Sequence, residues 1–98
     1  MIAFILQYTE NGRSGTITFS SPETTFDMWY EFAASPALVI IGIPTPQHWE
    51  AQTKTPLPTR AALLDQIAKQ VIKDKVGSNG YHHVDDHTIT IFTGKNPR

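Results

Sequence analysis

The sequence contains no cysteine, which excludes a disulfide framework. A chain of 98 residues can nevertheless fold without a disulfide or a structural metal, because it can bury a single hydrophobic core. A cysteine-free composition is compatible with any compartment and slightly favours a reducing one. We therefore expect a cytoplasmic protein.

Long hydrophobic runs and an excess of charge are also missing. At the N-terminus only Ile2 to Leu6 are apolar, and no basic residue precedes them, which is too short for a signal peptide or a membrane span. The net charge is −1 and the pI is about 6.4, so no overall field favours nucleic acid or an anionic membrane. We expect a soluble protein without a membrane or nucleic-acid partner.

The clearest helical pattern runs from Pro58 to Gly77. Thr59 is placed to cap its start, and Gly77 is placed to end it. Its apolar residues recur at helical spacing and form one broad stripe that needs a surface to cover. These residues are Leu63, Leu64, Ile67, Ala68, Val71 and Ile72.

Two strands are predicted at residues 2–9 and 16–20, joined by a tight turn at Asn11-Gly12. A two-residue loop there pairs Glu10 with Arg13, Leu6 with Ile17 and Phe4 with Phe19. This register gives the hairpin one apolar face and one mostly polar face, as expected for a sheet that is covered on one side.

A helix is predicted from Ser21 to Ser35, because Ser-Pro-Glu is a typical helix start and Pro36 would end it. Its aromatic stripe contains Phe26, Trp29, Tyr30 and Phe32. The uniformly apolar run from Ala37 to Ile43 predicts a central strand covered on both faces. Strand, helix and strand would form a βαβ unit with parallel strands.

Residues 44–58 contain four of the seven prolines and form a predicted loop that is long for a small domain. The helix at 58–77 follows, then a strand at 87–92 with a less certain partner strand at 81–84, and a flexible tail at 94–98. The expected fold is one α+β domain over residues 1–98. It would be a two-layer sandwich with a mixed sheet of about four to five strands and two helices on one face.

The segment 81–87, YHHVDDH, is the most suggestive cluster for chemistry. Imidazole and carboxylate groups suit zinc or another divalent metal, and His83, Asp85 and His87 would point the same way in an extended chain. The candidate ligands are therefore His82, His83, Asp85 and His87. The spacing matches no specific metal signature, and a polar hairpin tip is the favoured explanation. His82 would share a face with Val84 and be half-buried.

His48, Trp49 and Glu50, in the proline-rich segment, are the candidate partner-binding residues. A loop tryptophan among polar residues is a common anchor for a partner. The alternative, favoured by base rates of burial, is that Trp49 folds back into the core.

No motif predicts catalysis. The interpretation that remains is a non-enzymatic protein-interaction or regulatory domain that binds itself as a homodimer, another protein, or both. The alternative is a divalent-metal-binding protein or metal-dependent enzyme that uses the 81–87 cluster.

Overall fold

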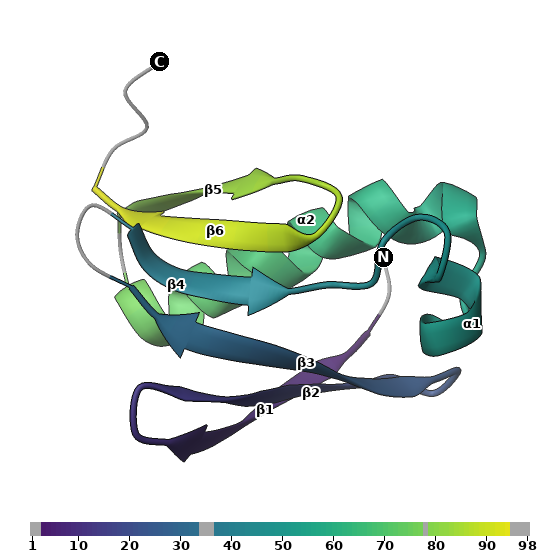
Figure 1. Cartoon of the computed structure of the whole chain (residues 1–98), viewed down its shortest axis with the longest axis horizontal. Coiled ribbons are helices and arrows are strands. Elements are labelled where there is room, and N and C mark those ends of the chain that lie inside the picture. The colour runs from purple at the N-terminus through teal and green to yellow at the C-terminus, as the bar shows by residue number, and fades with distance from the viewer. Residues whose placement is uncertain (1–2, 34–36, 78, 95–98) are drawn as a thin grey trace.

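The computed structural model describes residues 3–33, 37–77 and 79–94. In this part of the chain six strands form one antiparallel sheet in the order β1-β2-β3-β4-β6-β5 (Figure 1). The strands are β1 (Ile5–Asn11), β2 (Ser14–Ser20), β3 (Thr25–Phe32), β4 (Ala37–Gly42), β5 (Gly80–Val84) and β6 (Thr88–Thr93). The α+β class is confirmed, but the sheet has six strands and none of them is parallel.

Two α-helices accompany the sheet, α1 (Trp49–Thr53) and α2 (Arg60–Val71). A 3₁₀ turn, η1 (Leu57–Thr59), precedes α2, and a π-helical turn, η2 (Ile72–Val76), extends it. The helix predicted at 58–77 is therefore confirmed, and Gly77 ends it at a positive φ of 97°. Thr59 occupies the N-cap position, although its hydroxyl donates to the carbonyl of Pro56 rather than capping the helix.

The N-terminal hairpin forms with a register two residues away from the predicted one. Leu6 pairs with Phe19 and Tyr8 with Ile17, so the turn residues are Gly12 and Arg13, with Gly12 at a φ of 72°. A shift of two leaves every side chain on its predicted face, because side chains alternate with a period of two. The predicted pairing of Glu10 with Arg13 is wrong.

Glu10 instead forms an ion pair of 2.7 Å with Lys75 in η2. Next to it, the Tyr8 hydroxyl donates a 2.7 Å hydrogen bond to Asp74, and the Lys75 ammonium lies 4.3 Å from the centre of the Tyr8 ring. These contacts tie the last helical turn to strand β1.

The helix predicted from Ser21 is wrong, because this segment is the strand β3. Ser21 and Thr24 close the hairpin turn from β2 through backbone and side-chain hydrogen bonds, and proline is favoured at the second position of such a turn. Beyond the turn Phe26, Met28 and Tyr30 are buried, with exposed residues between them. The predicted helix end at Ser35–Pro36 lies outside the described residues.

The strand predicted at 37–43 is confirmed as β4, which lies between β3 and β6. Since β3 replaces the predicted helix, no βαβ unit exists and β4 runs antiparallel to both neighbours. Val39 and Ile41 are fully buried, whereas Ile40 between them is half-buried. The strand is therefore covered more completely on one face than on the other.

The C-terminal hairpin of β5 and β6 confirms the less certain of the strand predictions. Its turn is held by Asp85, whose Oδ1 accepts hydrogen bonds of 2.8 Å from the backbone N–H groups of His87 and Thr88. The predicted tail lies outside the described residues beyond Gly94.

The core lies between the sheet and α2, which runs behind the strands in the view of Figure 1. The apolar stripe of α2 packs on alternate residues of β2, β3, β4 and β6, and α1 closes one end of the core with Trp49. The fully buried side chains include Trp49, Tyr30, Phe19, Ile17, Ile41, Leu63, Leu64 and Ile67. Within the described ranges, no helix has the length and apolar character needed to cross a membrane.

Candidate functional site

The two faces of the sheet differ sharply. We call the side packed against α2 the covered face and the opposite side the open face. No described helix crosses the open face along β3, β4 and β6 in Figure 1. Because successive side chains of a strand point to opposite faces of the sheet, one set of side chains lies on the open face. Over β3 to β6 the set is Thr25, Asp27, Trp29, Glu31, Ile40, Thr88, Thr90, Phe92, Tyr81 and His83.

Trp29 is the most prominent member of this set, with 51% of its surface exposed. Its indole lies against Gly42 on the neighbouring strand β4, where a Cβ would overlap the indole ring atoms. Glycine at position 42 therefore lets the indole lie against the sheet. The indole keeps one side in contact with β4 and presents the other to solvent.

Half-buried apolar side chains continue from Trp29 across the sheet. Ile40 lies on β4, and Phe92 and Tyr81 stack with ring centroids 4.8 Å apart on β6 and β5. We call Trp29, Ile40, Phe92 and Tyr81 the apolar band. A surface that exposes aromatic groups of this size is typical of an interaction site, since buried aromatic anchors dominate interface energetics.

The charges on the open face have one sign. Asp27 and Glu31 lie on either side of Trp29 along β3, and both are exposed. None of the six strands contains Lys or Arg, and every described Lys and Arg except Arg13 lies between Lys54 and Lys75. Among the ion pairs of the described residues, none involves Asp27 or Glu31. Their carboxylates are thus available to a cation.

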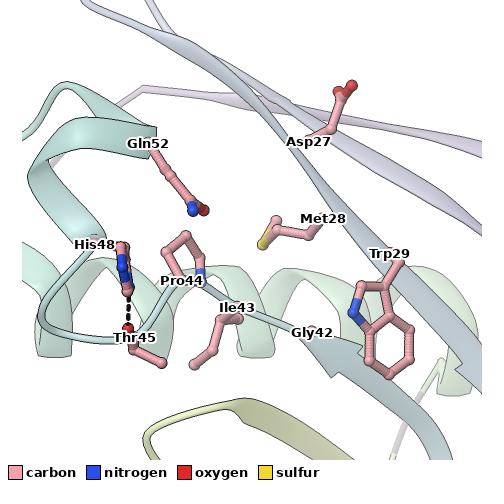
Figure 2. A pocket seen from close by; sticks show the side chains of 9 residues that line it. All are labelled: Asp27, Met28, Trp29, Gly42, Ile43, Pro44, Thr45, His48 and Gln52. Carbon is pink, nitrogen blue, oxygen red and sulfur yellow. Dashed lines mark hydrogen bonds between the residues drawn. The ribbon is translucent and has the colours of Figure 1, made fainter.

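A shallow hollow of about 280 Å³ lies beside Trp29, between β3, the end of β4 and the start of α1. Figure 2 shows Asp27 and Trp29 on one side and Gln52 and His48 on the other. Its remaining lining residues are Met28, Gly42, Ile43, Pro44 and Thr45. The hollow is at the small end of the range for ligand pockets, roughly 300–1,000 Å³, so it suits one side chain better than a large ligand.

A second hollow, of about 310 Å³, lies at the β2–β3 turn. Its lining contains both Glu23 and Lys54, and its aromatic residue, Phe19, is buried. It therefore has neither the single sign of charge nor the exposed ring that distinguishes the surface around Trp29.

The three predicted partner-binding residues lie in different environments. Trp49 is fully buried, so it lies in the core, as the alternative interpretation of the sequence predicted. Its indole N–H has no acceptor among the described residues. Arg60 lies 5.7 Å from the centre of its ring. Glu50 accepts a 2.9 Å hydrogen bond from the backbone N–H of Leu57. Only His48 lines the hollow, where its Nδ1 lies 2.9 Å from the Thr45 hydroxyl (Figure 2).

The four candidate metal ligands do not come together. Strand alternation places His82 on the covered face and His83 on the open face, and His82 is half-buried, as predicted. Asp85 is engaged in its own turn, and His87 is exposed beside it. Within the described ranges, no group of three or more His, Asp or Glu side chains has an arrangement that could hold a metal ion.

Hydrogen bonds lower the pKa values of two carboxyl groups, those of Asp85 and Asp65. The backbone N–H groups of His87 and Thr88 hold the pKa of Asp85 below its ordinary value. The pKa of Asp65 on α2 is also lowered, first by the Lys69 ammonium at 2.9 Å and further by His82, whose Nε2 lies 3.2 Å away. Both carboxylates accept hydrogen bonds from backbone N–H groups or pair with cationic side chains. Asp27 accepts a hydrogen bond from the Thr18 hydroxyl, but neither it nor Glu31 pairs with a cation among the described residues.

The sequence pattern assigned Trp29 to the aromatic stripe of a helix, and the open face was therefore missed. The signal that identifies it is a period of two: Phe26, Met28 and Tyr30 alternate with Asp27, Trp29 and Glu31. In a strand this pattern places Trp29 on the same face as the two carboxylates.

Comparisons of the chain with protein-family models, with curated proteins and with solved structures found no match.

Proposed function

We propose that this chain is a non-enzymatic protein-interaction domain that binds another protein through the open face of strands β3 to β6. The observation that carries the proposal is the half-exposed indole of Trp29, which lies between Asp27 and Glu31 on a face that no described helix covers. A tryptophan of this kind offers a large, rigid contact area at low entropic cost.

The apolar band gives this surface the composition of an interface. Aromatic residues are enriched at interfaces, and charged residues are depleted in their centres. Here the aromatic groups run across β3, β6 and β5, while the threonines of the neighbouring strand β2 form a polar border. A partner that lies across the band would bury the aromatic rings and leave the hydroxyl groups at the rim.

The negative charges of the open face favour binding of a different protein there over binding of a second copy of this chain. A two-fold dimer brings the same patch of both subunits together. The open face carries two carboxylates, and its strands have no Lys or Arg to pair with them. Such a dimer would bury like charges without compensation, which is unfavourable. A partner with complementary charge does not have this cost.

Self-association remains a second candidate, through a different part of the molecule. Strand β1 is an edge of the sheet, spans seven residues and contains neither proline nor lysine. Edges of this kind are templates for pairing with a second strand. Native mass spectrometry over a range of concentrations tests it: a dimer that Gln7→Lys dissociates supports pairing along β1, and a monomer throughout contradicts it.

The main proposal is tested by selecting binders from a displayed library of random peptides, with the wild-type chain as the target. We expect enriched peptides whose binding is lost with Trp29→Thr and retained with Ile5→Thr. Ile5 is the matched control, because it is an apolar side chain, 65% exposed, on the edge strand β1 away from the band. Peptides that bind equally well to both variants would contradict the proposal.

A further inference from the structure

The geometry points to the chemistry of the partner: we infer that its central recognition element is a positively charged side chain, an arginine or a lysine. This side chain stacks on Trp29 and pairs with Asp27, with its stem in the adjacent hollow. The inference rests on the proposed function, because it concerns the same face, and it names what that face selects.

The indole of Trp29 is positioned to receive a cation. Because Gly42 lets one side of the Trp29 ring lie against β4, a ligand meets the other side. The face of an aromatic ring carries negative electrostatic potential, and tryptophan attracts a cation more strongly than tyrosine or phenylalanine. Elsewhere in this molecule Arg60 lies over Trp49 and Lys75 over Tyr8. Trp29 has no such partner among the described residues.

The carboxylates of Asp27 and Glu31 can accept further hydrogen bonds. Asp27 Oδ1 accepts a 2.7 Å hydrogen bond from the Thr18 hydroxyl, which holds the side chain in place. Within the described part of the chain, no donor reaches Oδ2 and no cation pairs with Asp27 or Glu31. An arginine can bind a carboxylate through two parallel hydrogen bonds, whereas a lysine acts as a compact charge.

The hollow beside Trp29 has both apolar and polar lining residues. Its apolar lining residues include Met28, Ile43 and Pro44, which are buried, and its polar ones include Gln52 and His48, which are exposed (Figure 2). Long cationic side chains bury an apolar stem and keep a charged end near water. A hollow of about 280 Å³ that has Asp27 among its lining residues accommodates such a side chain.

Other ligand classes fit the same surface less well. A phosphate group or nucleic acid requires cationic or backbone N–H donors, and the strands here carry no Lys or Arg. A divalent metal requires several converging oxygen or nitrogen ligands, which the described residues do not provide.

The test uses two blocked peptides that differ at one position, acetyl-Gly-Ala-Arg-Ala-Gly-amide and the same peptide with citrulline, the neutral analogue of arginine. Binding is followed by NMR through the two indole N–H signals, of which Trp29 reports the site and Trp49 the core. We expect the arginine peptide to shift the Trp29 signal saturably and to bind about two- to five-fold more tightly than the citrulline peptide.

Charge-removing variants sharpen the test. Asp27→Asn keeps the shape and the acceptor for Thr18, and we expect it to weaken binding of the arginine peptide by about two- to five-fold. The matched control, Glu23→Gln, removes an exposed carboxylate from the β2–β3 turn and should leave the affinity unchanged. Equal affinity for both peptides, or equal effects of the two variants, would overturn the inference.

The result also separates this inference from the proposed function. If displayed peptides depend on Trp29 but contain no arginine or lysine, and Asp27→Asn has no effect on them, the inference fails and the interaction surface remains. If no selected peptide depends on Trp29, both proposals fail together.

Discussion

The two tryptophans of this chain occupy opposite environments. Trp49 is fully buried between α1 and the covered face, near the ring of Phe26, whereas Trp29 is half exposed on the open face of β3. Trp49 is flanked in the sequence by His48 and Glu50, whereas Trp29 is flanked by Met28 and Tyr30. The difference shows that the layer in which an aromatic residue lies decides whether it stabilises the fold or remains available to a partner.

The largest effect is expected for Trp49→Ala. Removing a fully buried tryptophan leaves a cavity and should lower the free energy of unfolding by about 3–5 kcal/mol. Urea denaturation followed by circular dichroism measures this. A nearly unchanged midpoint would show that Trp49 lies outside the core and would remove the contrast between the two tryptophans.

Gly15→Ala should have the next largest effect. Gly15 pairs with Tyr30 on the covered face, and a Cβ there would overlap the backbone carbonyl of Thr9, which cannot move away easily. We expect a loss of about 1–3 kcal/mol in the free energy of unfolding.

Gly42→Ala is the counterpart of this substitution on the open face. The three atoms nearest to its Cβ would all belong to the side chain of Trp29, which can swing outward. The loss in stability should be smaller than for Gly15→Ala, and the fluorescence of Trp29 should change. If Gly42→Ala proved the more costly substitution, the indole would be held as firmly as a core residue.

Trp29→Thr should change the free energy of unfolding by less than about 1 kcal/mol, because the residue is half exposed and threonine suits a strand. Peptide binding should nevertheless be lost. The same denaturation experiment, run beside Trp49→Ala, makes the comparison direct. A destabilisation as large as that of Trp49→Ala would place Trp29 in the core.

The smallest effect is expected for Asp65→Asn. Since the folded pKa of Asp65 lies below its ordinary value of 3.8, its contribution to stability is present above about pH 4 and is lost as the pH falls through the folded pKa. The ion pair with Lys69 is partly exposed, so we expect a loss of about 0.3–0.5 kcal/mol at pH 7. Denaturation of both proteins between pH 2 and 7 should show the difference disappear in acid. A constant difference would contradict it.

Several elements were predictable from the sequence because a single pattern determined them. The helix α2 has one apolar stripe, β4 is a continuous apolar run, and both terminal hairpins alternate. The first hairpin turn was displaced because glycine suits more than one position in a short loop, and its faces were still correct because the shift was even.

Strand β3 was mispredicted because its residues satisfy two periods. Phe26, Trp29 and Tyr30 lie on one side of a helix, while Phe26, Met28 and Tyr30 lie on one face of a strand. Ser21-Pro22 is typical both of a helix start and of a turn, so it could not decide between them. Pairing with β2 and β4 decides it, and such long-range contacts cannot be read from a local pattern.

The candidate site was missed for the same reason. Once β3 is read as a helix, Trp29 joins the apolar side, and the one remaining tryptophan, Trp49, becomes the apparent surface anchor. His48 was the one predicted partner-binding residue that lines the hollow beside Trp29.

The most direct test of the central claim is an NMR map of the backbone and indole N–H signals during titration with a peptide selected by display. The account predicts shifts at Trp29 and at its neighbours on the open face of β3, β4 and β6, with the Trp49 indole and the segment from Lys69 to Val76 unchanged. Shifts that centre on Trp49 or on the helical side would contradict it.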